Sequence, residues 1–240
     1  MNSLMTMISR PWMAMAVVAL SLGAVSCGDD EPTGPDPNEG KKAKVTAFYA
    51  QIDETPEKVD FMYNTTEIVN ELTYGMTATA DLQIGSNVTV KVTGLSGTEL
   101  PGASASAKVD STTATWFVYT GSGTTAEAFA VATPKRTIGT GQAGLRVIHA
   151  SPGAPKVEMH LLSNDGAVIG SAVEYKKGST EFTPVQITTP NVVITREDDT
   201  ELVPLNITLE QGKLYTVVVY GNPQASATSN KLTAKLVVEP

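Results

Sequence analysis

A pattern of short strands that occurs twice restricts the fold more than any other feature of this sequence. Its clearest opening is Gly144–Leu161, which has the pattern of a strand, a Ser-Pro-Gly turn and a second strand. A weaker copy covers Lys44–Tyr63. Four groups match in the same order at offsets of 98 to 102 residues: Val45–Tyr49 with Leu145–His149, Lys58–Asp60 with Lys156–Glu158, Thr98–Leu100 with Thr200–Leu202, and Thr115–Tyr119 with Thr216–Tyr220. An ordered series of matches at a nearly constant offset indicates an internal duplication.

Between these groups, apolar and polar residues follow the two-residue period of half-buried strands. Alternation places apolar residues on one face in two runs, Val88–Thr93 and Val203–Leu209. Pro204 predicts an edge position for the second run, because proline has no N–H to offer a neighbouring strand. Leu214–Tyr220 is apolar at nearly every position, which is typical of a strand covered on both faces.

Each copy of the pattern has about 90 to 95 residues and about seven strands. This size and spacing favour an antiparallel sandwich of the immunoglobulin type. We therefore predict an all-β fold with two tandem immunoglobulin-like antiparallel β-sandwich domains, at residues 44–134 and 144–240, joined by a linker at 135–143. The alternative is one larger sandwich in which the two halves exchange strands.

The charge balance excludes some classes of partner. The net charge is −8, with no basic stripe to neutralise phosphates, so nucleic acid is not an expected partner. The same balance argues against electrostatic binding to anionic lipid. The sequence contains one cysteine, which excludes an internal disulfide.

The first 26 residues have the pattern of an export signal. Arg10 is their single charged residue, and Trp12–Val25 is almost entirely apolar or small. This run is shorter than the ~20 residues that a membrane-spanning helix needs. We therefore predict a cleaved signal peptide at residues 1–26.

The signal peptide ends in Ala24-Val25-Ser26-Cys27, which resembles the lipobox of bacterial lipoproteins. The resemblance implies cleavage before Cys27 and attachment of a diacylglyceryl group to its thiol, with palmitate among the expected acyl chains. Each buried methylene contributes ~0.8 kcal/mol, so two chains would hold the protein on a membrane. The alternative is an ordinary secretory cleavage site, at which Cys27 is incidental.

The segment at residues 27–43, which follows the predicted cleavage site, has the composition of a disordered tether. Gly28–Ala43 contains three prolines, five acidic residues and no large apolar residue. Such a segment buries too little apolar surface to offset the entropy of ordering. We expect it to be extended and to hold the folded part away from the lipid.

Two strands of the second copy resemble those of a known family. Leu145–Val157, with its His-Ala-Ser-Pro sequence, resembles the opening of DUF4397 domains, and Leu214–Gly221 resembles their closing strand. The resemblance covers the second copy well and reaches the first only through the duplication. It implies β-sandwich repeats in exported bacterial proteins and lipoproteins, and it implies no chemistry.

Few residues in the sequence suggest a reactive or metal-binding site. A zinc or catalytic site would require His149 or His160 to converge with acidic or cysteine side chains, and His149 aligns with Tyr49, which indicates a structural ring. Gly139–Gly144 has the spacing G-x-G-x-x-G, but a strand rather than a helix follows it, so we interpret it as a linker. Trp116 lies among apolar residues and is expected in the core.

Two acidic turns are weaker candidates for calcium. Asn164–Gly166 and Asp198-Asp199 carry oxygen ligands, but neither has the spacing of a dedicated calcium loop. We interpret both as solvated hairpin turns, and we expect no metal and no cofactor.

These features favour a membrane-anchored lipoprotein of the bacterial envelope, on the inner or outer membrane and facing the periplasm or the cell surface. The expected role is non-catalytic: binding, adhesion or structure, with membrane lipid as a partner through acylated Cys27 and an envelope protein or glycan as a second partner. One alternative is a carbohydrate- or cell-wall-binding module, which would require aromatic or carboxylate side chains exposed on a sheet face. Another is a metal-dependent hydrolase, which would require His149 or His160 to line a pocket with acidic residues.

Overall fold

The structure is a computed structural model, and it describes residues 40–52, 56–161, 163, 166–188, 191–196, 201–225 and 231–240. These residues belong to one compact unit, Pro37–Pro240. The predicted signal peptide, Cys27, most of the tether, Asn164, Asp165 and Asp198-Asp199 lie outside the described residues. Within the described ranges, no helix is long and apolar enough to cross a membrane.

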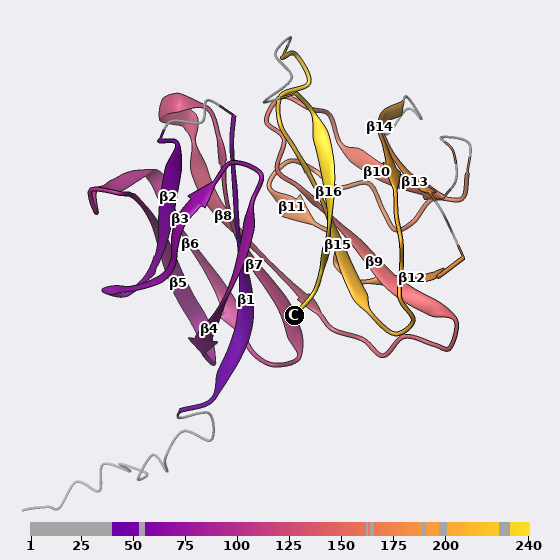
Figure 1. Cartoon of the computed structure of the whole chain (residues 1–240), viewed down its shortest axis with the longest axis horizontal. Coiled ribbons are helices and arrows are strands. Elements are labelled where there is room, and N and C mark those ends of the chain that lie inside the picture. Colours follow the sequence, from indigo (N-terminus) through magenta and orange to yellow (C-terminus); the bar gives the residue numbers. More distant parts are fainter. Residues whose placement is uncertain are drawn as a thin grey trace, which may run out of the picture. The chain divides into compact units, whose positions relative to one another are not determined.

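The fold is all-β, as predicted, and its four sheets form two β-rich halves (Figure 1). The first half has an inner sheet with the strand order β4-β1-β7-β8: β4 (Thr77–Gln83), β1 (Lys42–Gln51), β7 (Thr113–Gly121) and β8 (Glu127–Pro134). Its outer sheet has the order β3-β2-β5-β6: β3 (Thr66–Thr73), β2 (Lys58–Tyr63), β5 (Gly85–Gly94) and β6 (Glu99–Val109). A short 3-10 helix, η1 (Gly123–Thr125), lies between β7 and β8.

The second half repeats this plan with strands that are mostly shorter. Its inner sheet has the order β11-β9-β15-β16, with β12 also paired to β9: β11 (Lys177–Gly178), β9 (Gln142–His149), β15 (Leu214–Tyr220), β16 (Thr233–Val238) and β12 (Thr183–Gln186). Its outer sheet has the order β10-β13-β14: β10 (Val157–Leu161), β13 (Asn191–Arg196) and β14 (Glu201–Asn206).

Strand register confirms the duplication. In the first inner sheet β1 and β7 run parallel, with Val45 opposite Thr115; in the second, β9 and β15 run parallel, with Leu145 opposite Tyr215. Both partnerships span 70 residues of chain. Each parallel pair is extended by an antiparallel neighbour, β8 in the first half and β16 in the second.

The predicted strand patterns are confirmed where the structure describes them. Val88, Val90 and Val92 of β5 are buried, while Thr89 and Lys91 between them are exposed. β14 lies at the edge of its sheet with Pro204 exposed. β15 lies between two strands, and its five central residues are buried.

The tether predicted at residues 27–43 overlaps the first strand by two residues. β1 begins at Lys42, so Lys42 and Ala43 belong to a strand rather than to a disordered segment. They pair with Gln83 and Leu82 of β4, and Ala43 is buried. Composition alone misses these residues, because their order depends on a partner strand about 40 positions further along the chain.

Three apolar clusters hold the unit together. One lies between the sheets of the first half and one between the sheets of the second. The third lies between the two inner sheets, and we call it the shared core: Phe48, Ala50, Trp116, Val118, Phe129, Val131, Ile148, Ala150 and Val218. All nine residues of β7 are buried, because Phe117 and Tyr119 face the first cluster while Trp116 and Val118 face the shared core. The two halves are therefore joined by packed side chains as well as by the linker.

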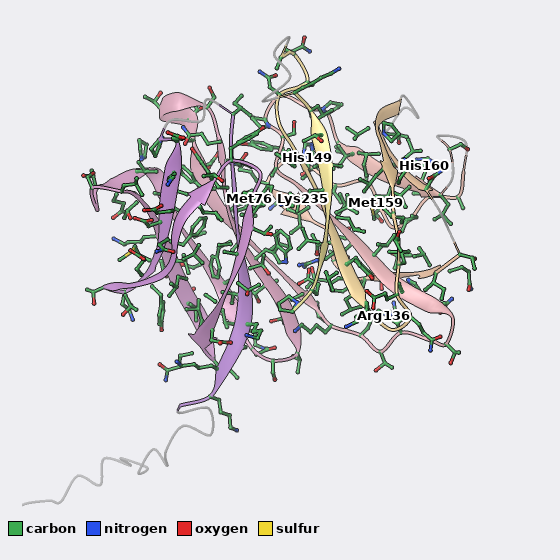
Figure 2. The ribbon with its side chains drawn as sticks, viewed as in Figure 1. Met76, Arg136, His149, Met159, His160 and Lys235 are labelled. Carbon is green, nitrogen blue, oxygen red and sulfur yellow. The ribbon has the colours of Figure 1, made fainter. Side chains whose placement is uncertain are left out.

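A lysine also connects the halves at the edge of the shared core. The Nζ of Lys235 in β16 donates to the carbonyl oxygen of Gly75, in the turn between β3 and β4, at 2.8 Å. Figure 2 shows Lys235 beside Met76, the next residue of that turn. Burial lowers the pKa of the Lys235 ammonium group below its ordinary value.

Candidate functional site

The two halves use equivalent rings for the same structural purpose. In the second half, Nε2 of His149 lies 2.9 Å from the carbonyl oxygen of Pro155. In the first half, the hydroxyl of Tyr49 donates to the carbonyl oxygen of Pro56 at 2.5 Å. The duplication aligns His149 with Tyr49, and each bond fixes the chain that leaves the turn after the first strand. His149 therefore has the structural role that the sequence predicted.

The partners of His149 define its tautomer. The backbone N–H of Ser151 donates to Nδ1 at 3.2 Å, so Nδ1 carries no proton and Nε2 donates to Pro155. The ring is fully buried and meets Tyr175 edge-on. Burial lowers the pKa of His149 below its ordinary value, and its bonds to the carbonyls of Pro155 and Ala154 partly oppose that shift.

We expect this burial to make stability depend on pH through His149. Below the ordinary histidine pKa of about 6.5, the unfolded chain binds a proton that the folded chain does not, so stability falls as pH falls. The substitution His149→Gln should flatten the loss of stability between about pH 7 and pH 5, as measured by urea unfolding. Tyr49→Phe removes the equivalent bond without a titrating group, so it should leave the pH dependence as in the unmodified chain. Equal pH dependence in the two variants would contradict this assignment.

His160 lies in a different sheet, in β10 of the second outer sheet (Figure 2). Its Nδ1 is 3.1 Å from the carbonyl oxygen of Gly166, and its Nε2 is 3.3 Å from the carboxylate of Glu158. The structure thus attaches the two histidines to different segments of backbone. In the part of the chain that is described, no group of three or more His, Cys, Asp or Glu residues could hold a metal ion.

The Ser-Pro-Gly turn after β9 ties three strands together. The hydroxyl of Ser151 donates to the carbonyl oxygen of Gly221 at 2.5 Å. The N–H of Ala150 donates to the carbonyl oxygen of Val219 at 2.7 Å. The carbonyl oxygen of Ala150 accepts from the hydroxyl of Thr120, at the end of β7 in the first half, at 2.6 Å. The His-Ala-Ser-Pro sequence is therefore a structural connection, both within its own half and to the other one.

Among the described ion pairs, the most buried one lies in a cluster that the sequence did not reveal. Arg146 of β9 and Glu239, just beyond β16, form an ion pair of 2.9 Å, with side chains 0% and 2% exposed. Arg146 also donates to the hydroxyl of Thr216 at 2.7 Å and to the carbonyl oxygen of Ala114 at 3.1 Å. Trp116 donates its indole N–H to the Glu239 carboxylate at 3.0 Å. We call this set the buried ion-pair cluster, and it spans both halves.

Arginine suits this position because its planar guanidinium can donate to several acceptors at once. Burial lowers the pKa of the Arg146 guanidinium, and the neighbouring Glu239 carboxylate opposes that shift. The ring of Phe182 lies 4.9 Å from the guanidinium carbon and covers one of its faces. The only signal in the sequence was an arginine at the second position of an otherwise apolar run, Leu145–Ile148.

A polar hollow of about 370 Å³ opens beside β11, and we call it the β11 hollow. Its lining includes two lysines, two glutamates and several hydroxyl groups: Lys156, Lys177, Glu174, Glu181, Ser171 and Thr180. The segment around it includes β11 and β12, which pair with β9 as β4 pairs with β1 in the first half. Next to β10, isolated bridges between Val157 and Val173 and between His160 and Val168 stand where β3 pairs with β2 in the first half. The second copy is therefore less regular around the hollow than the first.

The structure also places two other candidates from the sequence, Trp116 and the segment Gly139–Gly144. Trp116 is fully buried, as predicted, and so offers no platform for a sugar ring. The glycine-rich segment Gly139–Gly144 leads directly into β9, as expected for a linker followed by a strand. Cys27 lies outside the described residues.

Comparison with protein families finds a match to part of the chain. Residues 50–160 match DUF4397, a domain of unknown function. The match runs from the end of β1 to β10, so it covers most of the first half and ends shortly after the His-Ala-Ser-Pro turn. No curated protein matches the chain. Residues 50–160 are thus similar to DUF4397, mainly in the first copy rather than in the second copy, where the sequence resemblance was expected.

Proposed function

We propose that this protein is a lipid-anchored, non-catalytic binding protein of the bacterial envelope. The binding role is supported by a contrast between polar side chains that bond within the fold and polar side chains that line an accessible hollow. His149 and the buried ion-pair cluster bond to the fold itself, whereas the polar side chains of the β11 hollow face an accessible space. Such an arrangement suits a rigid body that presents a surface. The anchor rests on the lipobox-like sequence that ends at Cys27.

We further propose that each half is a variant of the immunoglobulin-type sandwich. Two facing sheets, mostly antiparallel pairing and a unit size close to that predicted support this assignment. The parallel pairing of β1 with β7, repeated by β9 with β15, is a shared departure from a purely antiparallel pattern. Its recurrence fits two copies of one ancestral unit.

A carbohydrate- or cell-wall-binding role is the second candidate. The β11 hollow favours it, because hydroxyl, ammonium and carboxylate groups are the partners that a hydroxyl-rich ligand requires. With Trp116 buried, such a site would depend on hydrogen bonds rather than on stacking against that ring. The metal-dependent hydrolase remains a hypothesis without a supporting contact among the described residues.

The anchor is tested by acylation of the full chain. In a bacterial host, we expect a mature terminus at Cys27 that carries acyl groups, incorporation of a labelled palmitate analogue, and recovery in the membrane fraction. The substitution Cys27→Ala should abolish the label and release the protein from the membrane, because the acyl chains supply the binding free energy. Mass spectrometry that finds an unacylated mature terminus would sink the proposed anchor.

A further inference from the structure

The β11 hollow has the composition of a ligand site, and we propose that it binds a small acidic saccharide, one that combines hydroxyl groups with a carboxylate. This inference rests on the proposed binding role and specifies its site and ligand class. At about 370 Å³, the hollow falls at the small end of the volumes typical of ligand pockets. Its size therefore suits one or two sugar rings rather than a large cofactor.

The charges around the hollow leave one ammonium group available. Glu174 is paired with Lys156 at 3.8 Å, and Glu181 with Arg136 at 3.5 Å. Lys177 also lines the hollow, and none of the described residues forms an ion pair or a side-chain hydrogen bond with its ammonium group. The lining contains two lysines and two glutamates, so its formal charges cancel, and among the described residues Lys177 is the lysine of the lining that forms no ion pair. A ligand that complements the Lys177 ammonium group carries a negative charge.

The backbone holds Lys177 in place at the hollow. Lys177 pairs with His149 in the two-residue strand β11, and its N–H donates to the carbonyl oxygen of Glu174 at 3.1 Å. Gly178, next to it, packs closely against the first half: a Cβ there would lie 2.6 Å from Val131. The backbone at Lys177 is therefore held in place, and its exposed side chain lines the hollow.

Hydroxyl groups supply the rest of the recognition surface. Ser171, Thr180 and Thr183 line the hollow, whereas the hydroxyl of Ser179 bonds to the backbone of Val147, and no aromatic side chain is in the lining. Hydroxyls both donate and accept hydrogen bonds, which matches the hydroxyl groups of a sugar ring. An acidic peptide would satisfy the ammonium group but would match fewer of the hydroxyls. The lining consequently favours an acidic saccharide over a peptide of equal charge.

The first half provides an internal comparison. Lys58 of the first half is equivalent to Lys156. It forms an ion pair with Glu71 at 2.7 Å, beside the regular strands β3 and β4. In the second half, the corresponding ion pair with Glu174 is longer and borders open space. The two copies thus differ at this position in the distance of the lysine–glutamate ion pair.

Calorimetric titration of the full chain in detergent tests the inference. The probe is digalacturonic acid, and the comparators are its neutral methyl ester and an acidic dipeptide of equal charge. We expect the acid to bind most tightly, because a charge-assisted hydrogen bond adds to those of the hydroxyls. The substitution Lys177→Gln should weaken binding about tenfold, while Lys213→Gln, an exposed lysine outside the hollow, should leave it unchanged.

Each other result overturns a defined part of the inference. Equal binding to the acid and to its ester would remove the role of the charge, and stronger binding to the dipeptide would replace saccharide by peptide. Binding that Lys177→Gln leaves intact would place the site elsewhere while keeping the binding role. Failure to bind the acid at about 10 mM would reject this ligand class, whereas the acylation experiment tests the envelope role separately.

Discussion

Replacing Arg146 with alanine is expected to lower the free energy of unfolding by about 3–5 kcal/mol, because the change leaves a buried carboxylate without its partner. The Glu239 side chain is 2% exposed, so its carboxylate depends on the guanidinium rather than on bulk solvent for its stabilisation. The hydroxyl of Thr216 and the carbonyl of Ala114 also lose a donor. Urea unfolding followed by circular dichroism measures the effect.

The surface pair between Arg136 and Glu181 provides a matched control. Both side chains are exposed and 3.5 Å apart, so Arg136→Ala should cost no more than about 1 kcal/mol. The double replacement Arg146→Met with Glu239→Met should recover much of the loss, because apolar side chains of similar size can replace a buried pair. If Arg146→Ala and Arg136→Ala lowered the free energy of unfolding equally, burial would not explain the contribution of the inner pair to stability.

The second large effect is expected at the shared core. Trp116→Ala should destabilise the protein by about 3–5 kcal/mol, since it removes the largest fully buried side chain of the described residues and leaves a cavity between the inner sheets. It also removes the indole N–H that donates to Glu239 at 3.0 Å. Because the lost contacts join the halves, we expect this variant to separate their unfolding into two transitions.

The substitution Trp116→Phe separates the loss of apolar contact from the loss of the hydrogen bond to Glu239. Phenylalanine keeps most of the apolar contact and loses the bond to Glu239, so it should cost about 1–3 kcal/mol and leave one transition. Calorimetry and fluorescence together measure whether the halves unfold as one unit. A Trp116→Ala variant with unchanged stability and a single transition would refute the energetic coupling of the halves through this residue.

Some of the architecture could be predicted from the sequence because it depends on local pattern. The alternation at Val88–Thr93, the continuous apolar run at Leu214–Tyr220 and Pro204 at an edge each describe a single strand and its two faces. The duplication was visible because the two copies kept short groups of residues in order. It also predicted the structural role of His149 through its alignment with Tyr49.

The candidate site could not be predicted in the same way. The β11 hollow lies beside a two-residue strand and a segment with isolated bridges in place of a regular strand like β3 of the first half, and such an irregular segment has no period to recognise. Its lysines and glutamates occur at spacings that carry no motif. Whether Lys177 has a partner depends on which chain segments fold around it, which requires the tertiary structure.

The sequence by itself determined the β class, the two copies, the strand faces and the export-type N-terminal pattern, since each is expressed within a few consecutive residues or by their repetition. Only the tertiary structure decided that the inner sheets share a core and that Arg146, Trp116 and Glu239 meet within it. Glu239 lies 93 residues from Arg146 and 123 from Trp116. Contacts over such separations depend on how whole sheets pack, and no local pattern encodes that packing.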